Sequence, residues 1–178
     1  MADILRRFQE QAHQRDYCRK HRAEVIDPPE KLNDRWFTSS GQPSPELHTK
    51  HLWLMENLRN LPDVKSRIGD YFTIVDILII GGQTQSGCSN GDLDMYVWLK
   101  DTMRPLYLTS DERDLRNVIA AAINKLPPGM DLAQMMKAVG KPNFIDVYIS
   151  TVKPKKSGQS TGAEIYYSFT LDRWIRFP

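Results

Sequence analysis

The chain has 178 residues, of which 40% are hydrophobic and 26% are charged, and its formal net charge is +2. These values are typical of a soluble globular protein long enough to bury a sizeable core, and they exclude a surface coated in positive charge. No apolar run approaches the length of a membrane span, and the first residues lack the apolar core of a secretory signal.

The two cysteines, Cys18 and Cys88, lie far apart in the chain. Their spacing indicates neither a zinc site nor a disulfide framework. We therefore expect an intracellular protein, cytoplasmic or nuclear, in a reducing compartment.

Residues 1–22 predict a basic helical arm. Apolar side chains recur at helical spacing at Ile4, Phe8 and Ala12. The basic residues of the arm are Arg6, Arg7, Arg15, Arg19, Lys20 and Arg22. One interpretation is an amphipathic arm whose cations contact the phosphates of nucleic acid or of an anionic membrane surface. The other is a solvated helix with one stripe packed on the core.

The segment from 27 to 45 contains several prolines and loses any helical or strand period. Its Trp36-Phe37 pair is expected to be anchored on the domain or on a partner subunit, because large aromatic side chains are rarely left in water. We predict that residues 1–45 form the basic helical arm and a Pro-containing linker. Residues 46–178 are predicted to form a single α+β domain.

Hydrophobic periodicity predicts the elements of this domain. Helices are predicted over 46–61, 110–126 and 131–139, and strands over 71–80, 93–99, 144–152 and 164–170. Residues 173–177 either form a C-terminal strand or offer aromatic and cationic side chains to nucleotides. The order of elements predicts an α+β fold, a mixed β-sheet packed by helices with the N-terminal basic helical arm.

Two aspartates, Asp92 and Asp94, begin the strand predicted over 93–99. Alternate residues of a strand share a face, so both carboxylates would point away from the core that Leu93 enters. Aligned carboxylates can hold a divalent cation such as Mg²⁺, and such ions serve phosphate chemistry. Asp146, inside the strand predicted over 144–152, is placed to complete this site from a neighbouring strand.

A plainer interpretation of the same residues is an ordinary hairpin. Asn90-Gly91 is a turn signal between two apolar strands. Asp92 and Asp94 would then be exposed solubilising groups, Asp146 would be a charge on an edge strand, and the glycines would only supply positive φ.

Three parts of the sequence together resemble the nucleotidyltransferase superfamily that includes DNA polymerase β. They are Ile80-Gly81-Gly82, then, after nine intervening residues, Asp92-Leu93-Asp94-Met95, and finally Asp146 flanked by Ile145 and Val147. The resemblance covers roughly residues 70–170 and implies a polymerase β-like palm. It implies that Asp92, Asp94 and Asp146 are catalytic and bind Mg²⁺, and that Gly81 and Gly82 bind the phosphates of a nucleotide. Nucleotidyl transfer, with a nucleoside triphosphate or nucleic acid as partner, would be the activity, unless the site is degenerate.

A second, shorter resemblance points to a non-enzymatic protein. One stretch of the chain is similar in layout to part of rhabdovirus matrix proteins. It consists of Arg104-Pro105-Leu106, followed by Ser110-Asp111 and a helix containing Ala120-Ala121-Ala122. It implies a virion-associated assembly protein that self-associates and binds nucleic acid or an anionic membrane surface.

A second basic feature lies between the last two predicted strands. Its lysines, Lys153, Lys155 and Lys156, would either guide a phosphate backbone by long-range attraction or remain solvated.

Overall fold

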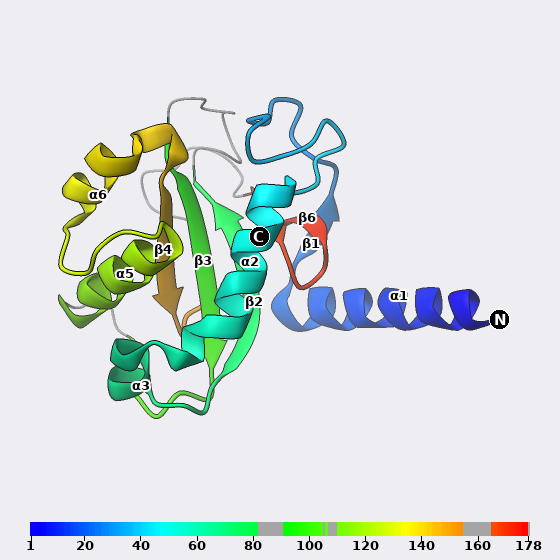
Figure 1. Ribbon diagram of the computed structural model, residues 1–178. Coiled ribbons are helices and arrows are strands. Elements are labelled where there is room, and N and C mark those ends of the chain that lie inside the picture. Colours follow the sequence, from blue (N-terminus) through cyan, green and yellow to red (C-terminus); the bar gives the residue numbers. More distant parts are fainter. Residues whose placement is uncertain (82–90, 105, 107–109, 155–164, 178) are drawn as a thin grey trace.

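The computed structural model describes residues 1–81, 91–104, 106, 110–154 and 165–177 (Figure 1). The described helices are α1 (Ala2–His21), α2 (Pro45–Asn57), α3 (Pro62–Ile68), α5 (Ser110–Ile123) and α6 (Leu132–Val139), with 3₁₀ turns at Leu58–Asn60 and Lys141–Asn143. The strands are β1 (Glu24–Ile26), β2 (Thr73–Ile80), β3 (Leu93–Lys100), β4 (Ile145–Ser150), β5 (Ile165–Ser168) and β6 (Arg173–Arg176). The predicted α+β class, with helices packed on a mixed sheet, is confirmed.

The six described strands form one sheet in the order β1-β6-β5-β2-β3-β4. β3 and β4 run parallel, while the other paired strands run antiparallel. A parallel pair needs a long crossover connection, and α5 and α6 lie on the crossover between β3 and β4. This crossover places β4 beside β3 at the edge of the sheet.

α2 begins where the sequence provides an N-terminal cap. The Ser44 hydroxyl accepts a hydrogen bond from the backbone N–H of Leu47 at 3.2 Å, and Pro45 occupies the first helical position. The helix predicted over 46–61 ends earlier, because a proline at 62 favours extended backbone at Leu61, whose ψ is 123°. α3 then starts at Pro62, and neither this helix nor β1 was predicted from the sequence.

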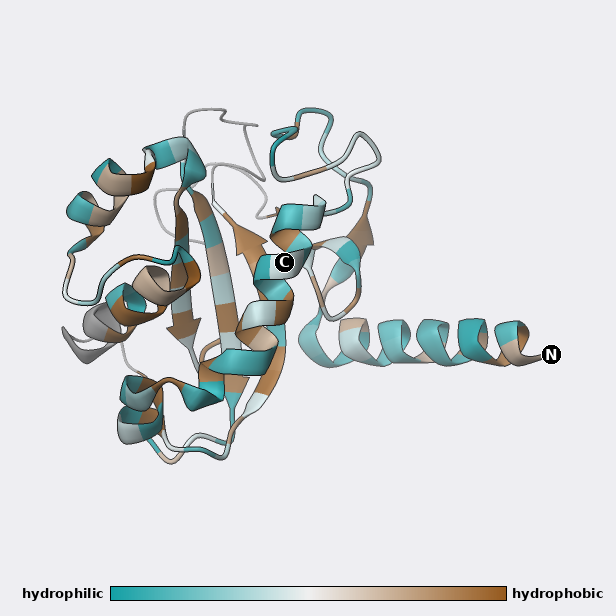
Figure 2. Ribbon diagram, viewed as in Figure 1, coloured by the Kyte–Doolittle hydropathy of each residue, from teal (hydrophilic) through white to brown (hydrophobic). Residues whose placement is uncertain are grey.

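The main core lies between one face of the sheet and helices α2, α3 and α5. Leu93, Met95 and Val97 of β3 are 0% exposed and belong to this core, as the alternating pattern predicted. Figure 2 shows the hydrophobic colour of the strands that these helices cover. Asp94 therefore lies on the opposite face of β3, together with Trp98.

Residues that follow α1 also join the sheet and its core. β1 pairs antiparallel with β6, with Val25 opposite Ile175. Trp36 and Phe37 are 0% and 2% exposed, so the expected aromatic anchor packs into the main core. The indole of Trp174 donates to the Gly41 carbonyl at 2.7 Å, which ties this segment to β6.

α1 is held at its C-terminal end by a buried carboxylate. Asp76, 0% exposed on β2, accepts hydrogen bonds from the Tyr17 hydroxyl, from Ser168 Oγ at 2.6 Å and from the Thr170 backbone N–H at 3.0 Å. Burial raises the pKa of Asp76, and these hydrogen bonds partly offset the rise. The rest of α1 extends away from the sheet (Figure 1).

The predicted apolar stripe of α1 is largely in water. Ile4 and Phe8 are 59% and 63% exposed, so they do not pack on the core. No helix among the described residues is long and apolar enough to cross a membrane.

Candidate metal centre

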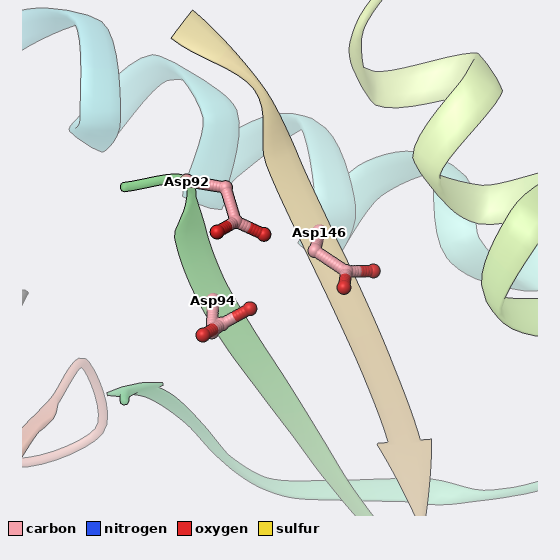
Figure 3. A group of neighbouring side chains, drawn as sticks. All are labelled: Asp92, Asp94 and Asp146. Atoms are coloured by element: carbon pink, nitrogen blue, oxygen red, sulfur yellow. The ribbon is translucent and has the colours of Figure 1, made fainter. Parts of the chain in front are cut away.

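Three carboxylates converge on the face of the sheet opposite the main core. Asp92 directly precedes β3, Asp94 lies on β3 and Asp146 lies on β4 (Figure 3). One carboxylate oxygen from each residue lies within 4.8 Å of the others. We call these three residues the acidic cluster, and their mutual distances allow one cation to contact all three.

The sheet register creates the acidic cluster. Asp94 and Asp146 are direct partners in the parallel pair of β3 and β4, so their side chains project from the same face. β2 and β3 do pair antiparallel, as the hairpin interpretation requires. However, Asp146 is 0% exposed, which excludes the interpretation of this residue as a solvated charge on an edge strand.

The electrostatics of the acidic cluster are unfavourable without a cation. Burial, followed by the negative charges of Asp92 and Asp146, raises the pKa of Asp94 to about 7, while Arg116 and Lys141 oppose the rise. Crowded carboxylates resist ionisation because each charge repels the next. A bound divalent cation would remove this repulsion, so the arrangement is suited to metal binding.

Arg116 of α5 is the counter-charge of Asp146. Its Nε donates to Asp146 Oδ1 at 2.8 Å and to Oδ2 at 3.0 Å, and its Nη2 donates to the same Oδ2. Nη2 also donates to the Tyr148 hydroxyl at 3.0 Å, and the guanidinium carbon lies 4.2 Å from the centre of the Tyr148 ring. Asp146 raises the pKa of Arg116 further above its ordinary value, so the guanidinium keeps its charge.

The sequence analysis did not identify Arg116 or Tyr148 as site residues. Arg116 follows Leu115 on a helix whose apolar stripe packs against the core, and nothing in the local pattern relates it to Asp146, 30 residues later. Burial, together with the nearby Asp94 and Asp146 charges, raises the pKa of Tyr148 to about 12, so its hydroxyl keeps its proton at neutral pH.

Gly81, predicted to bind phosphate, lies directly against the acidic cluster. It follows β2 with φ at +80°, a conformation that side chains disfavour. A Cβ at this position would lie 2.5 Å from Asp94 Oδ2, so only glycine leaves room for the carboxylate. Gly82 and Cys88 lie outside the described residues, while Cys18 is a free thiol.

The predicted basic residues of α1 lie away from the acidic cluster. Arg6, Arg7, Arg15, Arg19 and Lys20 belong to α1, and Arg22 is its C-terminal cap. α1 meets β3 near Trp98, four residues along the strand from Asp94 and therefore about 13 Å away.

Lys153 has a local role at the end of α1. Its Nζ donates to the His21 carbonyl at 3.2 Å and lies 5.2 Å from the centre of the Phe177 ring. Lys155 and Lys156 lie outside the described residues. Residues 173–177 form β6 and its continuation, and Trp174 and Phe177 are 2% and 7% exposed, so their rings are packed in the protein.

Comparison with protein-family models, with curated proteins and with solved structures finds no match to the chain.

Proposed function

We propose that the protein is a nucleotidyltransferase-like enzyme that transfers a nucleotidyl group with the help of Mg²⁺ bound at the acidic cluster. The convergence of Asp92, Asp94 and Asp146 from two parallel neighbouring strands is the observation that carries the proposal. Hard oxygen ligands of this kind suit Mg²⁺. The motif resemblance to the nucleotidyltransferase superfamily supports the same activity.

Each residue of the site has a distinct role in the proposal. Asp92 and Asp94 would hold the ion, which supplies neutralisation of phosphate charge when it is bound. Asp146 would complete the ligand set and help to deprotonate an acceptor hydroxyl, since a carboxylate can accept a proton. Arg116 pairs with Asp146 and would add positive charge beside the position of an anionic substrate.

The absence of a Cβ at Gly81 lets the end of β2 approach the acidic cluster closely, because the Asp94 carboxylate fills the space that a side chain would take. The proposed contact of this glycine with the phosphates of a nucleotide rests on the motif resemblance. The segment from 82 to 90 contains no lysine or arginine. Arg116 and Lys141, whose charges act on Asp94, would therefore provide positive charge that this segment lacks.

Calorimetric titration of Mg²⁺ and a nucleoside triphosphate tests the proposal. We expect nucleotide binding that requires Mg²⁺ and is lost when Asp92→Asn and Asp94→Asn are combined. The matched control is Asp70→Asn combined with Asp34→Asn, which removes two charges from exposed side chains. Nucleotide binding that persists without Mg²⁺, or in the double cluster variant, would refute the metal-dependent site.

A non-enzymatic assembly protein, similar to viral matrix proteins, is the second candidate. The exposed apolar side chains of α1 favour it, since a projecting helix with such residues is suited to interaction. This protein would self-associate and bind polyanions without metal, and its binding would weaken steeply with salt. The first candidate is expected in the cytoplasm or nucleus, whereas the second would be associated with a virion.

A further inference from the structure

The outer half of α1 presents apolar side chains on a face that the protein does not cover. Ile4, Leu5 and Phe8 are 59%, 61% and 63% exposed. Tyr17, which is buried against the sheet, lies nine residues after Phe8, and this spacing corresponds to opposite sides of a helix. The apolar residues therefore lie on the side of α1 opposite the side that packs against the sheet. We call the side that carries Ile4, Leu5 and Phe8 the free face of α1.

The attachment of α1 to the sheet gives the free face a fixed direction. The Tyr17 hydroxyl donates to the buried Asp76 carboxylate, and the His21 ring contacts the Trp98 ring edge-on with centroids 4.7 Å apart. The His21 carbonyl also accepts a hydrogen bond from Lys153 Nζ at 3.2 Å. These contacts hold the C-terminal end of α1, so the helix projects from the body of the molecule (Figure 2).

Cationic side chains continue the free face toward the sheet. Arg15 lies seven residues after Phe8, two turns further along the same side of the helix. Arg19 follows one turn later, with Asp16 at 3.2 Å on its flank.

The carboxylates nearer the tip lie on the other side of α1. Asp3 lies nine residues before Ala12, about 180° around the helix from it, and Glu10 lies two residues after Phe8, about 160° from it. Both carboxylates form ion pairs with Arg6, at 4.0 Å and 3.6 Å respectively. The free face is thus apolar at its tip and cationic toward its base.

This pattern does not suit a second copy of the chain. In a parallel pair of helices, Arg15 would face its own copy and repel it. In an antiparallel pair, the aliphatic tip of one helix would desolvate the guanidinium groups of the other. Nucleic acid would pair with the arginines but would leave Ile4 and Leu5 in water. An anionic lipid surface complements both parts, because apolar side chains enter the acyl boundary while cations contact phosphate groups.

We propose that the free face of α1 docks the protein on an anionic lipid membrane, with Ile4, Leu5 and Phe8 inserted at the interface and Arg15 and Arg19 on lipid headgroups. The helix lies in the plane of the membrane surface and does not span it. The acidic cluster plays no part in this docking, so the result of the test below is independent of metal or nucleotide binding.

Sedimentation with vesicles tests the docking with the full chain. Vesicles of phosphatidylcholine alone are compared with vesicles that also contain phosphatidylserine. We expect binding to the anionic vesicles that falls with salt, and a loss of about fivefold in Arg15→Gln. Lys20→Gln removes the same charge from a position about 140° around the helix and should cost less.

Exchanging two exposed side chains of α1 tests whether the Phe8 ring inserts into the membrane, without changing the amino-acid composition. Phe8→His combined with His13→Phe moves the ring about 140° around α1, away from the free face. We expect vesicle binding to fall by about tenfold, because the ring can no longer enter the membrane. Circular dichroism and the urea midpoint should match those of the unchanged protein, since both positions are exposed.

Three results would overturn the proposal. The first is equal or absent binding to the two kinds of vesicle. The second is unchanged binding in the Phe8/His13 swap. The third is dissociation of a dimer or larger assembly by that swap in sedimentation equilibrium without lipid, which would make a second copy the occupant of the free face.

Discussion

Removing the ionisable group of Asp94 should stabilise the metal-free protein at alkaline pH. The pKa of this carboxyl rises from 3.8 to about 7 in the folded protein, a change of about 3 pKa units. At about 1.4 kcal/mol per unit, ionised Asp94 destabilises the fold by about 4 kcal/mol as an upper limit, because the side chain keeps some contact with solvent. Asp94→Asn cannot ionise and should recover this free energy.

The direction of the pH effect on stability depends on whether the folded or the unfolded state binds the Asp94 proton more tightly. The folded protein binds the Asp94 proton more tightly than the unfolded chain does, so stability falls as the pH rises from about 4 to about 7. Below this window both states are protonated and the effect vanishes. The advantage of Asp94→Asn should therefore grow from about 1.5 kcal/mol at pH 5 to about 4 kcal/mol at pH 8.

Urea unfolding followed by tryptophan fluorescence measures this difference, with a chelator present at both pH values. Asp70→Asn is the control, since it removes a charge from an exposed side chain. Adding Mg²⁺ at pH 8 should stabilise the unchanged protein and leave Asp94→Asn nearly unaffected, because the ion binds the folded state only. If Asp94→Asn is no more stable than the unchanged protein at pH 8 with chelator, the reasoning about repulsion in the acidic cluster is wrong.

Three other substitutions address the contacts around the site and the arm. Arg116→Gln should cost about 3–5 kcal/mol in urea unfolding, because it leaves the buried Asp146 carboxylate unpaired, and Mg²⁺ should restore part of this loss. Tyr17→Phe should cost about 1–3 kcal/mol and speed proteolysis of the arm, since Asp76 loses a buried hydrogen bond, whereas unchanged cleavage would contradict this anchor. Gly81→Ala should weaken Mg²⁺ binding in calorimetry, as its Cβ would crowd a carboxylate of the acidic cluster; unchanged affinity would argue against that contact.

Local patterns in the sequence were sufficient to predict several elements. Alternation in β3 correctly separated the buried Leu93 from Asp94, because successive side chains of a strand face opposite sides whatever the strand pairs with. Ser44-Pro45 marked the start of α2, since capping needs only residues close in sequence. The three aspartates were also named from sequence, on the strength of their strand positions and a motif.

Long-range pairing decided what the local patterns could not. Whether Asp146 would lie beside Asp94 depended on the parallel register of β3 and β4, which many packing contacts set together. The same is true of Arg116, which reaches Asp146 from α5, and of Tyr17, which reaches Asp76 across 59 positions of sequence.

Patterns in the sequence were thus enough to indicate which carboxylates could form a site, which faces of the helices and strands are apolar, and that the arm is basic. Folding of the whole chain was needed to bring the carboxylates together, to pair Arg116 with one of them, and to leave the apolar side of α1 in water. Side-chain periodicity is a property of a few neighbouring residues, whereas register and burial depend on the packing of the whole chain.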